Sequence, residues 1–279
     1  MKKILLFLLS ISIVAALVSS CNVIDENDML VPIVDGGNDS VPVLDRTKKI
    51  LIEDFTGNRC PNCPKAATEL EKLVRMYPGR IVPISVHAGN FAIPIPFLGY
   101  EEDFRTSVGD SLNAFFGINA YPMGVIDMSK FNSSYLVDFG EWENIVSNII
   151  SSNAQAKVAI EITSDFDEAT GASQVNVKTV PYDLENENIS LCVYITEDNL
   201  ICQQANGTEV DTAYNHHHVL RGAYNGTWGG VIGNNAEETH TYSMNLNETW
   251  KKENCAVVAF VYNTTTKEVY QAETRKLMD

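Results

Sequence analysis

The sequence predicts an α/β domain over residues 48–155, followed by an all-β sandwich domain over residues 156–279. Residues 48–155 alternate short apolar strand-like runs with amphipathic helix-like segments, which is typical of a sheet covered by helices. Residues 156–279 are dominated by strand-like runs separated by turn residues, as in an antiparallel, immunoglobulin-like sandwich. The length of 279 residues suits two domains.

Residues 1–20 are predicted to be a lipoprotein signal peptide. Lys2 and Lys3 precede an apolar run that is too short for a lasting membrane span and ends in small residues. The run VSSC, which ends at Cys21, resembles a bacterial lipobox. That resemblance implies that cleavage leaves Cys21 as an acylated N-terminus that enters the bilayer. The alternative is an ordinary signal peptide with a chance cysteine.

Residues 21–47 are interpreted as a lipid-anchored, flexible tether, because they lack a hydrophobic period and are rich in Asp, Asn, Gly and Pro. By analogy with other lipoproteins, Asn22 after the lipid-bearing cysteine favours the outer membrane, on its periplasmic face or at the cell surface. The acids Asp25, Glu26 and Asp28 fit either a surface-export tag or a solvated linker.

The α/β domain is predicted from seven consecutive segments. Apolar residues of residues 64–77 lie on one helical face, and Pro78-Gly79 ends that helix. The predicted elements are strand 48–55, helix 64–77, strand 80–89, loop 90–100, helix 101–117, strand 122–128 and helix 138–152. The sandwich is predicted from strands at residues 156–166, 173–182, 189–197, 200–205, 214–224, 240–246, 255–263 and 269–277.

Two cysteines separated by two residues lie where the first strand turns into the first helix. Cys60 would lie near the N-terminus of that helix, where free N–H groups and the helix dipole stabilise a thiolate, and Arg59 adds a positive charge. Cys63 would lie one turn later as the resolving thiol of a disulfide pair. Two alternatives remain, a structural disulfide and half of a zinc site, although no second cysteine pair of this kind follows.

The segment LIEDFTGNRCPNC resembles the active site of thioredoxins. The resemblance implies that Asp54, six residues before Cys60, is a buried acid that handles the proton of Cys63. It also implies that Tyr121-Pro122 is a cis peptide bond opposite the dithiol, where the Tyr121 backbone could pair with a substrate chain. The dithiol would then act in thiol-disulfide exchange.

The chain as a whole resembles the outer-membrane-protein (Omp) lipoproteins of Bacteroidetes. The motifs FTGNRCPNCP and HHHVLRGAYNGTWG carry this resemblance, which covers nearly the whole mature chain. It implies a location in the cell envelope and says little about a substrate.

Cys192 and Cys202 flank a predicted hairpin with its turn near Glu197-Asp198, so a cross-strand disulfide would fit. Two separate thiols are the alternative, and Cys255 is left over. In a continuous strand, His216 and His218 would share one face, and with His240 they would offer a zinc or copper site. A polar strand face is the commoner use of such a run, so we assign no metal.

Two main functions follow from these observations, and metal handling through the dithiol or the histidines is a third option. The first is a thiol-disulfide oxidoreductase that uses Cys60, Cys63 and Asp54, binds client chains at Arg59, Tyr121 and Pro122, and needs no cofactor. Its partners would be protein thiols or disulfides of the envelope and, through Cys21, the lipid bilayer. The second is a non-catalytic surface-binding lipoprotein whose Cys60–Cys63 disulfide is structural. The net charge of −16 argues against nucleic acid as a partner.

Overall fold

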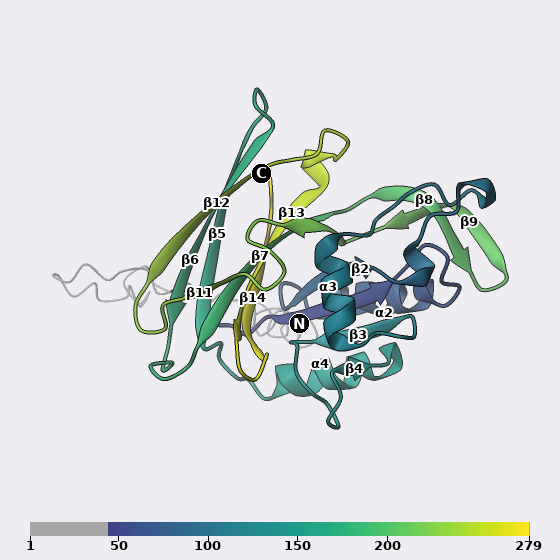
Figure 1. Cartoon of the computed structure of the whole chain (residues 1–279). Coiled ribbons are helices and arrows are strands. Elements are labelled where there is room, and N and C mark those ends of the chain that lie inside the picture. The colour runs from purple at the N-terminus through teal and green to yellow at the C-terminus, as the bar shows by residue number, and fades with distance from the viewer. Residues whose placement is uncertain (1–43, 279) are drawn as a thin grey trace, which may run out of the picture. The chain divides into compact units, whose positions relative to one another are not determined.

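The computed structural model describes residues 44–278 (Figure 1). The predicted signal peptide, the lipidation site Cys21 and nearly all of the tether therefore lie outside the described residues. Within the described part, no helix has both the length and the apolar character needed to cross a membrane.

The largest element is a mixed sheet of nine strands in the order β14–β13–β7–β10–β2–β1–β3–β4, with β11 paired to β7 beside this path. β1 and β2 run parallel, and β3 runs antiparallel to β1. β1 is buried on both faces, and its apolar residues Ile50, Leu51, Ile52 and Phe55 pack on both sides of the sheet. The strands are β1 Ile50–Thr56, β2 Ile81–His87, β3 Met123–Ile126, β4 Leu136–Val137, β7 Ile189–Glu197, β10 Val219–Ala223, β11 Gly230–Ile232, β13 Cys255–Asn263 and β14 Val269–Lys276.

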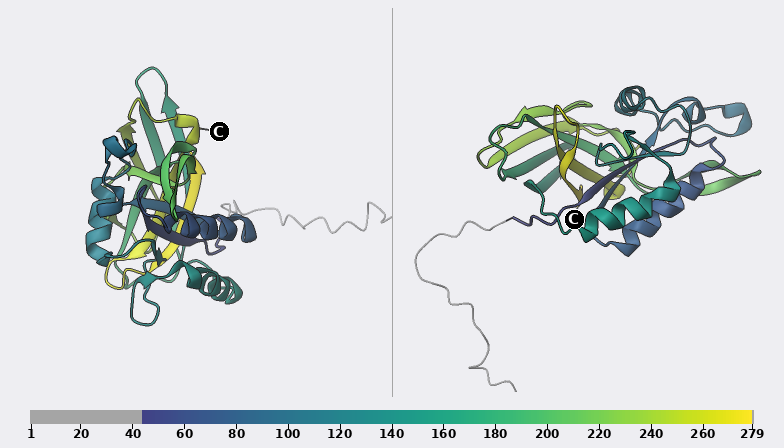
Figure 2. Two further views of the ribbon diagram at one scale, coloured as in Figure 1. Left: turned by 90° about the vertical axis from the view of Figure 1, so that its right-hand side faces the viewer. Right: turned by 90° about the horizontal axis from the view of Figure 1, so that it is seen from below.

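Helices cover both faces of the β1–β4 region (Figure 2). α2 (Cys63–Met76) and α4 (Trp142–Ser151) pack on one face against Ile50 and Ile52. α3 (Ser107–Phe116) packs on the opposite face against Leu51 and Phe55. The alternation of side chains along β1 thus sends odd-numbered residues to α3 and even-numbered residues to α2.

A second, three-stranded sheet in the order β12–β6–β5 packs over the β7–β13–β14 end of the large sheet, with a shared apolar core. Its strands are β5 Val158–Asp167, β6 Ala172–Pro181 and β12 Glu238–Asn245. The 3₁₀ turns of the structure are η2 Asn90–Ala92, η3 Pro96–Leu98, η4 Phe139–Glu141 and η5 Lys252–Asn254.

The two remaining strands, β8 (Leu200–Asn206) and β9 (Glu209–His216), form a separate two-stranded sheet. We call residues 200–216 the β8–β9 arm. In Figure 1 the arm extends away from the three-stranded sheet, beside the loop of residues 88–106 that joins β2 to α3. Gly99 of this β2–α3 loop lies against the side chain of Gln203 in the arm.

The sheet is continuous between the two predicted domains. Val219 of β10 pairs in parallel with Ser85 of β2, and the Ser85 N–H donates to the His218 carbonyl at 2.8 Å. The division of the chain near residue 155 stays a prediction, and the strands on its two sides share this one sheet.

Two predicted elements differ from the structure. The predicted strand 214–224 is broken, because His218 has a φ of 56° and its N–H donates to Asp198 Oδ1 at 2.6 Å. The predicted helix 101–117 begins only at Ser107, where the Thr106 side chain accepts from the Gly109 N–H. Such an N-cap fixes the helix start six residues later than the apolar pattern suggests.

Candidate active site

The cysteine pair lies in the turn between β1 and α2, and the two sulfurs form a disulfide, as predicted. The Cys60 N–H donates to the Gly57 carbonyl at 3.0 Å, and Pro64 follows Cys63 at the helix start. Only 1% of Cys60 and 2% of Cys63 is exposed, so solvent does not reach the disulfide freely. We call residues 57–63 the disulfide turn.

The β2–α3 loop supports one side of the disulfide turn. The Arg59 N–H donates to the Phe91 carbonyl at 3.0 Å, and the Arg59 guanidinium donates to the Asn90 carbonyl. A Cβ on Gly57 would lie 2.6 Å from the Phe91 carbonyl carbon, so a side chain there would force the loop away. Arg59 therefore holds the loop, and its predicted role in binding a client stays a prediction.

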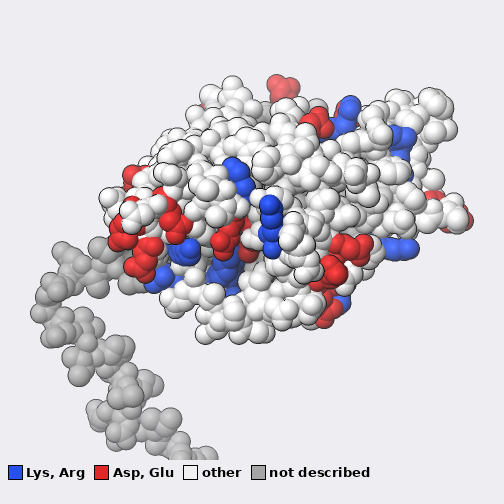
Figure 3. Space-filling model, turned by 60° about the horizontal axis from the view of Figure 1, so that its bottom comes forward, with Lys and Arg blue, Asp and Glu red and all other residues white. Residues whose placement is uncertain are grey.

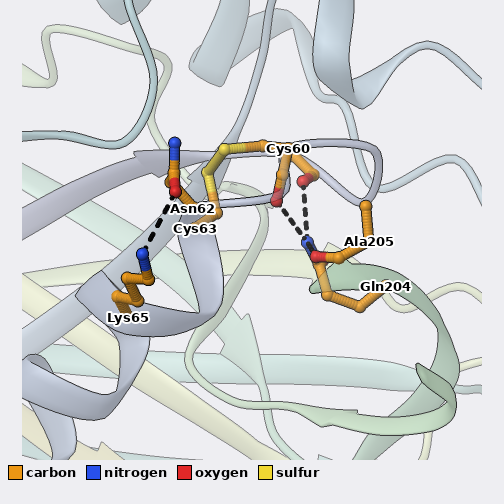
Figure 4. Close-up of a disulfide and its surroundings, with 7 residues drawn as sticks. Cys60, Asn62, Cys63, Lys65, Gln204 and Ala205 are labelled. Atoms are coloured by element: carbon orange, nitrogen blue, oxygen red, sulfur yellow. Dashed lines mark hydrogen bonds between the residues drawn. A yellow bond between two sulfur atoms is a disulfide. The ribbon is translucent and has the colours of Figure 1, made fainter. Parts of the chain in front are cut away.

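The β8–β9 arm covers the other side (Figure 4). The Gln204 side-chain amide donates to the Cys60 carbonyl at 2.9 Å and to the Gly57 carbonyl at 3.3 Å. The Ala205 N–H donates to the Asn58 carbonyl and the Gly207 N–H to the Pro61 carbonyl, both at 2.8 Å. Gln204 is thus a residue of the site that no local sequence signal indicates.

Asp54 lies on the β1 face that α2 covers and is 1% exposed. Its Oδ1 atom has no hydrogen-bond partner in the described part, and burial raises the pKa of this carboxyl to about 7. Asp54 and Cys63 line the same cleft, which brings together the predicted acid and the predicted resolving cysteine.

Glu53, the neighbour of Asp54, points to the opposite face and is fully buried in the core that contains Tyr194 and Cys192. Neither carboxylate oxygen of Glu53 has a hydrogen-bond partner among the described residues. Burial raises the pKa of Glu53 to about 8. The resemblance to thioredoxins implies that Asp54 is buried, but no sequence signal indicates the burial of Glu53.

A cleft of about 250 Å³ opens between α2 and the end of the β8–β9 arm. Polar residues of β1 and β2 form its floor, whereas most other positions of these strands are apolar. Its lining comprises Asp54, Thr56, Cys63, Pro64, Ala67, Thr68, Leu70, Glu71, Arg75, Ser85, His87, Gln204, Tyr214, Asn215, His216, His217 and His218.

Two neutral imidazoles face each other in this cleft. The rings of His87 and His216 lie 5.5 Å apart, and the Phe104 ring contacts both. Both His87 nitrogens and the Nε2 atom of His216 have no hydrogen-bond partner in the described part. Burial lowers the pKa of His87 well below its usual value and lowers the pKa of His216 to about 4.

His218 connects the cleft to α2. Its Nε2 lies 3.0 Å from Glu71 Oε1, and the hydrogen bond from His218 lowers the pKa of the Glu71 carboxyl. His240 lies on β12 beside Glu238, outside the cleft, so the three histidines considered for a metal are not brought together. Among the described residues, no group of three or more potential ligands could hold a metal ion.

The predicted bridge between Cys192 and Cys202 is wrong, since both residues are free thiols. Cys192 is buried on β7, whose neighbours in the sheet are β13, β10 and β11, whereas Cys202 lies on β8, which pairs with β9 in a separate sheet. The strands of the predicted hairpin, β7 and β8, therefore do not pair with each other. Cys255 is a buried free thiol at the start of β13.

The peptide bond between Tyr121 and Pro122 is cis. Met123, the next residue, pairs with Phe55 at the end of β1 that leads into the disulfide turn. The Tyr121 hydroxyl donates to Asn113 Oδ1, and its ring contacts Phe91 of the β2–α3 loop. The proposed role of Tyr121 and Pro122 in binding a client chain stays a prediction.

Comparison with known proteins adds a family and a fold. The sequence model of the family described as outer membrane protein Omp28 matches residues 109–278. No curated protein sequence matches the chain significantly.

Among solved structures, HBP35 of Porphyromonas gingivalis superposes with a TM-score of 0.67 at 17% identity, over 84% of this chain and 77% of that one. A protein of Agrobacterium tumefaciens superposes with a TM-score of 0.51 at 15% identity, over 84% of this chain and 96% of that one. A domain of the outer membrane lipoprotein Omp28 from Porphyromonas gingivalis is 29% identical over 44% of this chain and 88% of that one, with a TM-score of 0.32. At these identities, the first two similarities show a shared fold.

Proposed function

Because the chain belongs to the Omp28 family of outer membrane proteins, we propose that it is a thiol-disulfide oxidoreductase that acts on envelope proteins from the outer membrane. The observation that carries this proposal is that Cys63 of the Cys60–Cys63 disulfide and a buried carboxyl, Asp54, line one cleft. A perturbed acid next to a redox-capable pair is the arrangement that proton-coupled exchange requires.

The order and pairing of the first elements support a thioredoxin-like assignment of residues 48–155. β1 runs parallel to β2 and antiparallel to β3, α2 begins at Cys63, and a cis proline precedes β3. The two packed sheets of the second half support an immunoglobulin-like assignment of residues 156–279. The lipid anchor at Cys21 completes the proposal.

In the reducing direction, the Cys60 thiolate attacks one sulfur of a client disulfide. A Cys60–client disulfide forms, and the client's other sulfur leaves as a thiolate that takes up a proton. Cys63 then gives its proton to the Asp54 carboxylate and attacks the Cys60 sulfur. The second client thiolate leaves, and the Cys60–Cys63 disulfide forms again.

Two electrons pass from the protein dithiol to the client in this cycle. A dithiol donor protein of the envelope must supply them, and the reverse sequence oxidises a client dithiol. A carboxyl with a pKa of about 7 suits either direction, because it accepts and returns a proton near neutral pH.

A second function is favoured by one specific observation, the burial of both cysteines beneath the β8–β9 arm. A disulfide that is covered and hydrogen-bonded on two sides is suited to holding a turn in place. The protein would then be a non-catalytic lipoprotein that binds its partner through exposed surface residues, with a structural disulfide.

The reduction potential of Cys60–Cys63 separates the two functions. The chain from residue 22 would be equilibrated in glutathione and dithiothreitol buffers, and thiols read by alkylation mass shift, with Cys60→Ala as the control. A potential of roughly −270 to −120 mV supports exchange, and a potential below about −300 mV supports the structural disulfide. Client trapping by Cys63→Ser through Cys60 would then identify the substrates.

A further inference from the structure

We propose that the groove between the β2–α3 loop and the β8–β9 arm binds an extended polypeptide segment that is both basic and apolar. The groove measures about 280 Å³ and lies beside the disulfide turn. As a docking site for clients, it rests on the proposed function. Its lining comprises Asn58, Gly99, Tyr100, Glu101, Glu102, Cys202, Gln203 and Thr212.

Two residues that line the groove carry buried hydrogen-bond acceptors that lack donors. Asn58 is 3% exposed, and its Oδ1 has no partner in the part of the chain that the structure describes. Its Nδ2 is used, since it lies 3.5 Å from Cys202 Sγ. Gln203 Oε1 is a second acceptor without a partner in the same part of the chain. Buried polar atoms are rarely left unpaired, so this groove fits a ligand with N–H donors.

The charge of the groove favours a cation. Glu101 and Glu102 are exposed, and neither forms an ion pair among residues 44–278. Ammonium and guanidinium groups supply N–H donors together with positive charge, and their hydrogen bonds to carboxylates are stronger than neutral ones. Lysine and arginine side chains therefore match both the acceptors and the acids.

Exposed apolar side chains lie within two residues of lining residues in both segments that form the groove. Phe97 is 86% and Leu98 58% exposed on the β2–α3 loop, and Ile201 is 68% and Val210 48% exposed on the β8–β9 arm. Large exposed apolar side chains close to a groove are typical of a binding surface. Apolar residues of a bound segment would contact these side chains.

A membrane surface could also contact exposed apolar residues, but the charges oppose it. Glu101 and Glu102 would repel an anionic lipid surface. The chain carries a net charge of −16, and the face in Figure 3 has acidic and basic side chains interspersed rather than a broad basic area. A basic polypeptide therefore fits the groove better than a bilayer.

The groove is joined directly to the disulfide turn. Asn58 precedes Cys60 by two residues, and its carbonyl accepts from the Ala205 N–H of the arm. An extended chain advances about 3.3 Å per residue, so a cysteine a few residues from the docked segment reaches the turn. Docking thus selects which client sulfur meets Cys60.

The test uses the chain from residue 22 and a fluorescent twelve-residue peptide of alternating Lys and Leu or Val, without cysteine. The control peptide has Glu in place of Lys. Anisotropy should show saturable binding of the basic peptide and none of the acidic one. Glu101→Lys/Glu102→Lys should weaken binding at least about tenfold, because two charge-assisted contacts become repulsive.

The matched control is Glu161→Lys/Glu168→Lys, which makes the same charge change at exposed positions outside the groove. It should leave the affinity within about twofold, since distant exposed charges are screened. Phe97→Ser should weaken binding about fivefold through lost apolar contact. Equal weakening by the two charge reversals would overturn the proposal, and so would binding that is unaffected by either.

Two further measurements, of vesicle binding and of exchange with glutathione, distinguish a failure of the proposed groove from a failure of the proposed oxidoreductase function. Binding of phosphatidylethanolamine–phosphatidylglycerol vesicles through Phe97, without peptide binding, would overturn the groove in favour of a lipid contact. A dithiol that exchanges with glutathione while the peptide fails to bind would overturn docking and leave the proposed function standing. Peptide binding with a disulfide that resists exchange would support the groove and overturn the oxidoreductase.

Discussion

At the residue scale, the two adjacent acids of β1 are the least conventional feature of the core. Glu53 and Asp54 point to opposite faces of the sheet, and each lies in an environment that disfavours its charged form. Both carboxyls stay protonated in the folded chain at pH values at which they are ionised in the unfolded chain. Keeping these protons costs folding free energy, and the cost grows as the pH rises. The stability of the fold should therefore depend on pH.

The sign of this dependence follows from the shifted pKa values. Burial raises the pKa of Glu53 from 4.5 to about 8 and that of Asp54 from 3.8 to about 7, so the folded chain binds more protons than the unfolded chain between these limits. Stability must then fall as pH rises through this range. The lowered pKa values of His87 and His216 act in the opposite direction, but only below about pH 6.5.

We therefore expect the free energy of unfolding of the oxidised chain to fall by about 2–3 kcal/mol between about pH 6.5 and pH 8. Glu53→Gln should remove most of this fall, because the folded chain keeps the Glu53 proton over most of this range whereas the unfolded chain has lost it. Urea unfolding at several pH values measures the effect. A profile that is flat in the parent chain, or unchanged in the variant, would contradict the burial of a titrating Glu53.

Asp54 should affect the rate of exchange more than the binding of a client. Asp54→Asn removes the acceptor for the Cys63 proton, so release of a trapped mixed disulfide should slow about 100-fold at pH 7. The variant should recover part of this loss as pH rises, since Cys63 then ionises without help. A rate of release equal to that of the parent at pH 7 would remove Asp54 from the mechanism.

At the scale of elements, the disulfide turn depends on a hairpin that lies far from it in the sequence. The Gln204 side chain donates to two carbonyls of the turn, and each such bond contributes about 1 kcal/mol. Gln204→Ala should therefore open the turn and speed reduction of Cys60–Cys63 by dithiothreitol about tenfold.

Asn206→Ala is the matched control, because Asn206 is an exposed residue of the same strand. Reduction would be followed by stopped alkylation and mass shift. Equal rates in both variants would show that the arm does not limit access to the sulfurs.

A second contact between elements fixes how α4 packs on β3. A Cβ on Gly124 of β3 would overlap the indole of Trp142, a fully buried residue whose Nε1 donates to the Val137 carbonyl at 3.1 Å. Gly124→Ala should destabilise the fold by about 3 kcal/mol through overpacking. Gly230→Ala, which has open space around it, should change stability by less than about 0.5 kcal/mol in the same unfolding assay.

Features that depend on a few neighbouring residues could be predicted from the sequence, whereas contacts between distant segments could not. The strand, the disulfide turn and the following helix have local signatures, which identify Cys60 and Cys63, and the burial of Asp54 is implied by the resemblance of the segment to thioredoxins. Gln204 lies 144 residues from Cys60, and no periodicity reports such a pairing. The histidine run predicts a continuous strand, and the positive φ of His218, whose N–H donates to Asp198, has no signature in its own segment.

At the scale of the whole described part, one apolar core joins residues from both predicted domains. Leu51, Ile84 and Val125 from the first half share a cluster with Tyr194 and Phe260 from the second. Burial common to both halves couples their folding, since neither half alone completes this core.

Calorimetry of the oxidised chain from residue 22 should therefore show one cooperative transition for residues 44–278, with calorimetric and van't Hoff enthalpies that agree. Residues 156–279 expressed alone should lack the sharp transition of the parent. Two separate transitions would show instead that the predicted boundary near residue 155 divides independent folding units.

The long sequence separation between the disulfide turn and its cover has a consequence for biogenesis. The cysteines leave the export machinery well before the segment that contains Gln204, so the newly exported chain presents an uncovered pair. Oxidants and isomerases of the envelope have their best access during that interval. The order in which the two segments leave the export machinery thus fixes the interval in which the cysteine pair can be oxidised before the β8–β9 arm covers it.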